Sequence, residues 1–106
     1  MTKEELYQLS FQLILHSGNA RSLAMEAIFT AKEKNFSSAL EKLSEANSEI
    51  NHAHRFQTQL IHAEAGGEDF DIPIILVHAQ DHLMTAMTVI DLSREIVEIR
   101  QEMNNQ

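Results

Sequence analysis

The chain has 106 residues, which suits a single domain over residues 1–106, and its lack of cysteine excludes disulfides, thiolate metal sites and thiol nucleophiles. Eight basic residues are scattered among sixteen acidic ones, giving a formal net charge of −8, so a basic surface for nucleic acid is not expected. The acidic N-terminus lacks the pattern of a secretory signal, and the longest apolar run, Ile72 to Val77, is short and contains Pro73. We therefore expect no membrane span and a cytoplasmic location.

The first third of the chain has the apolar spacing of a helix. Three glycines and one proline are few for this length, and their scarcity favours helix throughout. Thr2 and Glu5 have the spacing of a capping box, which marks a helix start. We predict one helix from about Thr2 to Lys34, with Gly18 as the position at which it would bend. Its apolar stripe is Leu6, Leu9, Leu13, Ala20, Ala24, Ala27 and Ala31.

Two further helices are predicted in the rest of the chain. Asn35 suits a helix cap, and the second helix continues to the Gly66-Gly67 pair, which marks a break. A short acidic loop follows. Pro73 is favoured in a first helical turn and opens a third helix, which extends to about Glu102. The stripe of the second helix is Phe36, Ala39, Leu43, Ala46, Ile50, Ala53 and Leu60.

The lengths of these helices and of their connections predict the fold class. Each helix has roughly 30 residues and is therefore about 45 Å long, at 1.5 Å per residue. Short connections between long helices make sequential helices antiparallel neighbours. We predict an all-α fold, an antiparallel three-helix bundle with up-down-up topology.

The third helix carries more apolar surface than two neighbouring helices can bury. Its main stripe is Leu76, Ala79, Leu83, Ala86, Ile90 and Val97. Much of its remaining circumference is covered by Ile74, Val77, Met84, Met87 and Val89. A helix that is apolar nearly all round is usually buried all round, so we predict that further helices come from other copies of the chain. The alternative is a third helix that lies deep between its two partners in one chain.

A cluster of polar residues interrupts this apolar helix. His78 and His82 are four residues apart and Asp81 is three residues beyond His78, so the three project toward one side of the helix. Asp81 is also in line with Val77 and Met84, and burial of a carboxylate there is costly unless it is paired or bound to a cation. Polar groups that break the pattern of a well-patterned helix are candidates for function.

Three interpretations of the cluster compete. The first is that these are surface residues or hydrogen-bonded core residues. The second is a metal site, because two histidines at i and i+4 can bind zinc, although Ala79 stands where the zinc-protease helix has a glutamate. Glu49 and His52 have the Glu-x-x-His spacing of di-iron bundles, but those bundles need two such motifs and only one is present.

The third interpretation is a histidine that carries a phosphoryl group. Neutral imidazole is a nucleophile near physiological pH, and a polar neighbour must fix its tautomer so that the attacking nitrogen presents a lone pair. His82, one turn from His78, can do so. The chain has no glycine-rich phosphate-binding motif, so the phosphoryl donor is expected to be another protein and not bound ATP.

The segment from Val77 to Thr85, with the sequence VHAQDHLMT, resembles the active-site motif of the lactose/cellobiose-type enzyme IIA of the bacterial phosphoenolpyruvate-dependent sugar phosphotransferase system. Two further stretches agree with that family. They are Gly18-Asn19-Ala20-Arg21-Ser22 with Ala24-Met25-Glu26-Ala27, and Ala53-His54 followed by Gln57-Thr58. The resemblance covers nearly the whole chain, in order.

The resemblance implies an assembly and a reaction. The assembly is a homotrimer in which three subunits form a nine-helix bundle. His78 would accept phosphate from the histidine-containing phosphocarrier protein HPr and pass it to enzyme IIB. Asp81 would gather with its two copies around a metal ion, Mg²⁺ by expectation, at the trimer interface. His82 would orient the imidazole and hydrogen-bond near the phosphoryl group, with Gln80 as an additional donor.

The sugar is harder to predict, since this subunit need not touch it. Ala79 resembles cellobiose or chitobiose relatives more than lactose relatives, in which glycine is usual, so we expect a cellobiose/chitobiose-type disaccharide. A lactose-specific member, and a non-catalytic interaction or metal-binding module that has kept the fold, are the alternatives. We interpret His16, His52, His54 and His62 as ordinary surface or interface residues. Met84 and Met87 could contribute to an apolar docking surface.

Overall fold

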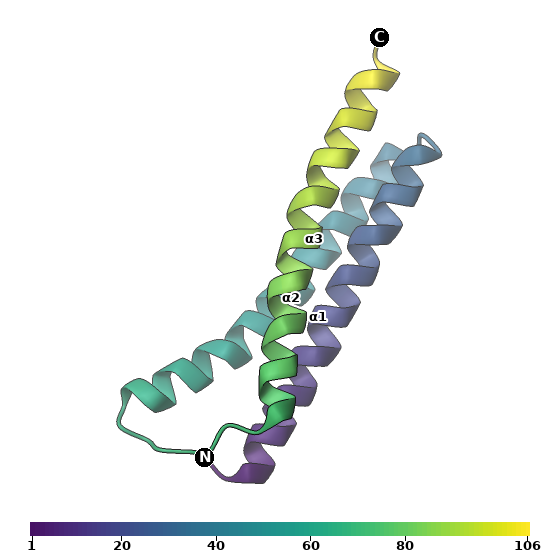
Figure 1. Cartoon of the computed structure of the whole chain (residues 1–106). Coiled ribbons are helices and arrows are strands. Elements are labelled where there is room, and N and C mark those ends of the chain that lie inside the picture. Colours follow the sequence, from purple (N-terminus) through teal and green to yellow (C-terminus); the bar gives the residue numbers. More distant parts are fainter.

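The computed structural model describes all 106 residues as three helices and no strand. Helix α1 comprises Lys3–Lys32, α2 comprises Phe36–Ala65 and α3 comprises Ile74–Asn104. Helices α1 and α3 run in the same direction with α2 antiparallel to them, in a bundle 57 Å long (Figure 1). The predicted all-α, up-down-up topology is confirmed. None of the three helices combines the length and the apolar character that crossing a membrane requires.

The helix ends follow from local hydrogen bonding. The backbone N–H of Glu5 donates to the Thr2 hydroxyl at 3.1 Å, as the predicted cap requires. Helix α1 ends at Lys32, two residues earlier than predicted, because Lys34 adopts the left-handed conformation with φ of 65°. The N–H of Asn35 then donates to the Thr30 carbonyl, which is the closing bond of a Schellman motif. This end was not predicted, since lysine is rare in the left-handed conformation.

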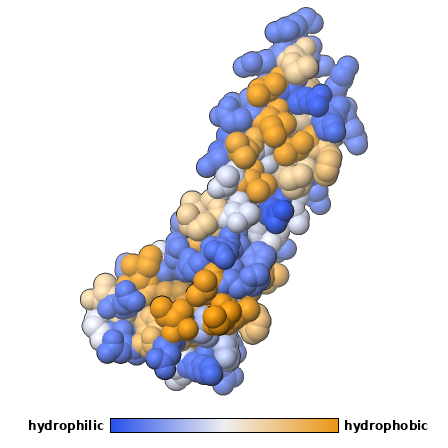
Figure 2. Space-filling model, viewed as in Figure 1, coloured by the Kyte–Doolittle hydropathy of each residue, from blue (hydrophilic) through white to orange (hydrophobic).

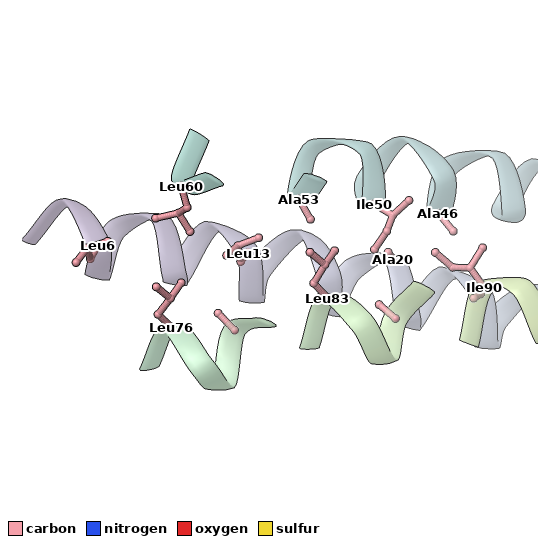
Figure 3. Close-up of a cluster of buried hydrophobic side chains, with 13 residues drawn as sticks. Leu6, Leu13, Ala20, Ala46, Ile50, Ala53, Leu60, Leu76, Leu83 and Ile90 are labelled. Atoms are coloured by element: carbon pink, nitrogen blue, oxygen red, sulfur yellow. The ribbon is translucent and has the colours of Figure 1, made fainter. Parts of the chain in front are cut away.

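The core follows a strict alternation of three- and four-residue steps. In α1 the buried residues are Leu6, Ser10, Leu13, Ser17, Ala20, Ala24, Ala27 and Ala31, and the same steps recur in α2 and α3. This spacing gives a seam like that of a left-handed coiled coil, packed as Figure 3 shows. Alanine occupies most buried positions in the C-terminal half of α1. Its small side chain lets the neighbouring helices approach closely.

Three buried serines belong to this core and were not predicted from the apolar pattern. The Ser10 hydroxyl donates to the Leu6 carbonyl at 2.7 Å within its own helix. The hydroxyls of Ser17 and Ser93 have no hydrogen-bond partner within the chain. Serine has nearly the volume of alanine, so it fits the seam, but an unpartnered hydroxyl costs about 1–3 kcal/mol.

A second apolar stripe lies outside the core seam of α3 and has two parts. The first part is Ile74, which is 84% exposed, with Val77 and Met84, and the second is Leu92, Ile96, Ile99 and Met103. Figure 2 shows apolar side chains gathered in two patches, one toward each end of the molecule, with mainly polar residues between them. The predicted excess of apolar surface on α3 is therefore present, while Met87 and Val89 pack partly against the core.

Gly18 lies within α1, which continues through it as one helix. A Cβ added at Gly18 would meet no atom within 4 Å. We therefore expect Gly18→Ala to raise the free energy of unfolding by about 1 kcal/mol, because alanine loses less backbone entropy in a helix. Urea unfolding followed by circular dichroism measures this difference. Ser22→Ala, on the same helix, should have a much smaller effect. A loss of stability in Gly18→Ala would instead mean that another chain packs closely against this position.

Candidate functional site

Two histidines in the first half of α3 form a close pair. The Nε2 atoms of His78 and His82 are 3.0 Å apart, and the rings meet edge to face with centroids 4.5 Å apart. The four-residue spacing stacks the side chains on one side of the helix. His78 is exposed and His82 is half-buried. At this distance one Nε2 carries the shared hydrogen and the other presents its lone pair.

This pair can make a single nitrogen nucleophilic. If His82 Nε2 carries the hydrogen, it donates to the single lone pair of His78 Nε2, while His78 Nδ1 carries its own hydrogen. That lone pair becomes free to attack when the His82 N–H turns away from it. A group attached to His78 Nε2 would lie next to the His82 N–H. The predicted orienting role of His82 therefore has the required geometry.

Gln80 lies on a different side of α3. It is two residues from each histidine, and residues two apart on a helix do not face each other. Its side chain turns toward α2, where Gln57 Nε2 donates to Gln80 Oε1 at 2.9 Å. Gln80 therefore does not approach His78 of its own chain.

Asp81 is exposed and lines a cavity of about 340 Å³. The wall of this cavity is formed by the end of α2, the loop after it and the start of α3, through Leu60, Ile61, Glu64, Phe70, Ile72, Leu76, Val77, Gln80 and Asp81. No three histidine, aspartate or glutamate side chains of one chain are placed to hold a metal ion.

A second polar cluster joins α1 to α2. His16 Nδ1 lies 2.7 Å from Glu49 Oε2, and the His16 ring stacks on His52 and on Phe56 with centroids 5.2 and 5.8 Å apart. Glu49 and His52, whose spacing is like that of a di-iron motif, therefore take part in a contact between α1 and α2. Sequence reasoning missed His16 as the partner of Glu49, because the residue comes from a different helix 33 positions away.

Comparison with known proteins identifies the family. Residues 8–101 match the model of the family described as "PTS system, Lactose/Cellobiose specific IIA subunit", where PTS stands for the phosphotransferase system. The chain belongs to this IIA family. It is therefore a phosphotransferase component, and the matched residues include nearly all of the three helices and the histidine pair.

Relatives of the IIA family resemble the chain along its whole length. It is 50% identical over 103 residues to the lichenan-specific phosphotransferase enzyme IIA component of Bacillus subtilis, a match covering 97% of this chain and 94% of that protein. The crystal structure of the PTS cellobiose-specific enzyme IIA from Bacillus anthracis is 47% identical, with a TM-score of 0.93, and covers 100% of this chain and 95% of that one.

A third IIA relative was solved together with a partner protein. It is the IIA(Chitobiose)–HPr complex of the Escherichia coli phosphotransferase system, determined in solution. Its matching chain is 37% identical, with a TM-score of 0.81, and the match covers 93% of this chain and 96% of that one. The resemblance first seen in the active-site segment therefore extends to the complete three-helix fold.

The pairing of the two rings can be tested by nuclear magnetic resonance. Nitrogen-15 shifts of the His78 ring should report one dominant tautomer in the wild-type protein, with the hydrogen on Nδ1, because the hydrogen bond from His82 fixes it. His82→Ala should return His78 to a mixture of tautomers. His54→Ala serves as the control, since His54 lies on α2 outside this pair. Identical His78 shifts in the wild type and in His82→Ala would contradict the pairing.

Proposed function

We propose that His78 is the phosphoryl carrier of this IIA component, accepting the group from HPr and passing it to enzyme IIB. The observation that supports this most directly is the 3.0 Å contact between His78 and His82, through which the His82 N–H can hold His78 in the tautomer with an unprotonated Nε2. The solved complex of a IIA relative with HPr supports the choice of donor.

In the transfer from HPr, the lone pair of His78 Nε2 attacks the phosphorus atom. The phosphorus–nitrogen bond on the HPr histidine breaks as the new bond forms, and its electron pair returns to the HPr ring. The His78 ring then releases its Nδ1 hydrogen and the HPr ring takes one up, so charge and protons balance. Transfer to enzyme IIB repeats these events with His78 as the leaving group. Catalysis is mostly alignment and electrostatic stabilisation.

His82 acts before and after the transfer. Before it, the N–H of His82 holds the His78 ring in the nucleophilic tautomer. Afterwards, the same N–H can donate to a phosphoryl oxygen on Nε2. A hydrogen bond to a charged group contributes roughly 1.5–3 kcal/mol, so His82 would stabilise the phosphorylated form.

The working assembly is a homotrimer built around α3. The second apolar stripe of α3 lies outside the core seam, and its exposed side chains form a surface that other copies of the helix can cover. Three chains related by a threefold axis would then form the nine-helix bundle. Further apolar residues on the exposed face of α1, Tyr7, Phe11, Leu15, Met25 and Phe29, add to the surface available for contact.

A threefold ring would complete the site with a residue from a neighbouring subunit. In a cyclic assembly one flank of a subunit meets the opposite flank of the next. Gln80 lies on the α2 flank of α3, and His78 with His82 lie on the other flank. The Gln80 amide of one subunit would thus meet the histidine pair of its neighbour, where it can donate to the phosphoryl group.

Asp81 would lie near the threefold axis, because it interrupts the second apolar stripe between Val77 and Met84. Three carboxylates pressed together must be protonated or bound to a cation. Oxygen donors of this kind suit Mg²⁺, with waters completing its coordination. The ion would neutralise the interface, and no part of the phosphoryl transfer depends on it.

The sugar we propose is a cellobiose/chitobiose-type disaccharide, taken up by a system whose IIA component works in the cytoplasm. Relatives named for lichenan and cellobiose support this class. The prediction of the sugar class from sequence rested on Ala79. This residue is completely buried in the core and cannot contact a sugar or a partner. Any link between Ala79 and the sugar is therefore indirect, through helix packing.

The phosphoryl carrier is tested by intact mass after incubation with phosphoenolpyruvate, enzyme I and HPr. The wild-type protein should gain one acid-labile phosphoryl group per chain, and His78→Ala should gain none because the nucleophile is absent. His62→Ala is the matched control, since this exposed histidine lies on α2 away from the pair. An unmodified wild-type chain, or a phosphorylated His78→Ala, would overturn the assignment.

The trimer and its ion are tested with Asp81→Asn. Light scattering of the wild-type protein should give the mass of three chains.

The ion is tested by unfolding. Mg²⁺ at a hundred times its dissociation constant should raise the free energy of unfolding of the wild-type protein by about 2.7 kcal/mol, compared with the protein in a chelator. Asp81→Asn should lose this dependence, because neutral amides need no counterion, whereas Asp91→Asn should keep it. A monomeric mass would refute the assembly, and equal Mg²⁺ dependence in all three proteins would refute the site.

A further inference from the structure

Gln57 occupies a core position of α2. The buried seam of that helix steps through Ala39, Leu43, Ala46, Ile50 and Ala53, and the next steps of four and three residues lead to Gln57 and Leu60. Every other position in this series is apolar. Gln57 is half-buried there. A leucine would fit the pattern better, so the glutamine calls for another explanation.

The partner of Gln57 supplies that explanation. Its Nε2 donates to Gln80 Oε1 at 2.9 Å, from α2 to α3, within the segment of α3 that carries the histidine pair. A second hydrogen bond between these helices, from Arg94 Nη2 to Asn47 Oδ1 at 3.3 Å, lies more than three turns further along α3. The Gln57–Gln80 bond is thus the polar link between the two helices at the site itself.

The direction of this bond determines what Gln80 presents to its surroundings. Because its carbonyl oxygen is taken by Gln57, the end left free is the NH₂ group, which only donates. We propose that Gln57 is a positioning residue, which holds the Gln80 amide so that its NH₂ group faces the phosphoryl group on His78 of the neighbouring subunit. This inference rests on the proposed function and deepens it.

One end of a glutamine amide donates hydrogen bonds and the other end accepts them, so the orientation of the side chain matters. A free glutamine side chain turns either its NH₂ or its carbonyl toward an anion, and fixing it costs conformational entropy. The phosphoryl oxygens are negatively charged, so a carbonyl facing them repels and an NH₂ group stabilises. Gln57 can bond to Gln80 in either direction, so the negative phosphoryl group favours the direction seen here, in which the Gln80 NH₂ is free. Gln57 holds the Gln80 side chain in place beforehand, so less conformational entropy is lost when the phosphoryl group arrives.

The decisive variant is Gln57→Glu, because a carboxylate accepts and cannot donate. It should take a hydrogen bond from the Gln80 NH₂ and turn the Gln80 carbonyl outward. We expect the isolated phosphorylated protein to lose its phosphoryl group about tenfold faster, measured by intact mass over time at neutral pH. Gln57→Leu, which suits the seam but frees Gln80, should give a smaller acceleration together with a higher melting temperature.

A second background separates positioning from a direct charge effect. In Gln80→Ala, Gln57→Glu should cause no further acceleration, because its effect passes through Gln80. The control Asn47→Ala removes the other hydrogen bond between α2 and α3 and should leave the rate of phosphoryl loss unchanged. Light scattering should give the same mass for every variant.

The outcomes distinguish this inference from the function on which it rests. A wild-type chain that is never phosphorylated defeats the carrier function, and the inference falls with it. A phosphorylated wild type in which Gln57→Glu has no effect, or has an equal effect in the Gln80→Ala background, overturns the positioning role alone. An unchanged rate in Gln80→Ala overturns it as well, while His78 remains the carrier.

Discussion

Helix α3 carries apolar residues on two faces, and the two other helices of the chain cover only one of them. Hydrophobic burial is worth roughly 25 cal/mol per Å² of apolar surface, so the exposed apolar residues of α3 would favour the proposed association of copies. Residues between the two faces then lie on the flanks of the helix, at the edges of any contact between copies. The histidine pair and Gln80 occupy these two flanks. The same periodicity that builds the bundle therefore sets where the chemistry can occur.

The apolar and polar patterns differ in how much they reveal from sequence. The core seam could be predicted at most positions, because it depends on the residue type and on the helix period alone. The helix start at Thr2 and the break at Gly66 also depend on local hydrogen bonds, and both were predicted. The serines of the seam were missed because serine fits a space of alanine size regardless of its polarity. Lys34 was missed because the turn imposes a conformation that lysine does not favour by itself.

The candidate site shows the same division. The contact of His78 with His82 follows from the four-residue spacing on one helix and needs no tertiary information. The bond between Gln57 and Gln80 joins two helices, as does the contact of His16 with Glu49. No spacing within one helix indicates such pairs. A usable signal for Gln57 was nevertheless present, since it is the single polar residue in the stepped series from Ala39 to Leu60.

Neutral hydrogen-bond donors near His78 would suit a protein that must pass on the phosphoryl group that it accepts. From Ile74 to Ser93 the chain has no lysine or arginine, so the donors that this segment can offer to phosphoryl oxygens are imidazole N–H, amide NH₂ and hydroxyl groups. Hydrogen bonds from cations are roughly twice as strong as those between neutral groups, and a cation here would hold the phosphorylated state too tightly. Binding that favours the intermediate over the transition state slows the next transfer. In the proposed transfer, oriented neutral donors would stabilise the phosphoryl group only moderately, which would keep transfer to and from His78 reversible.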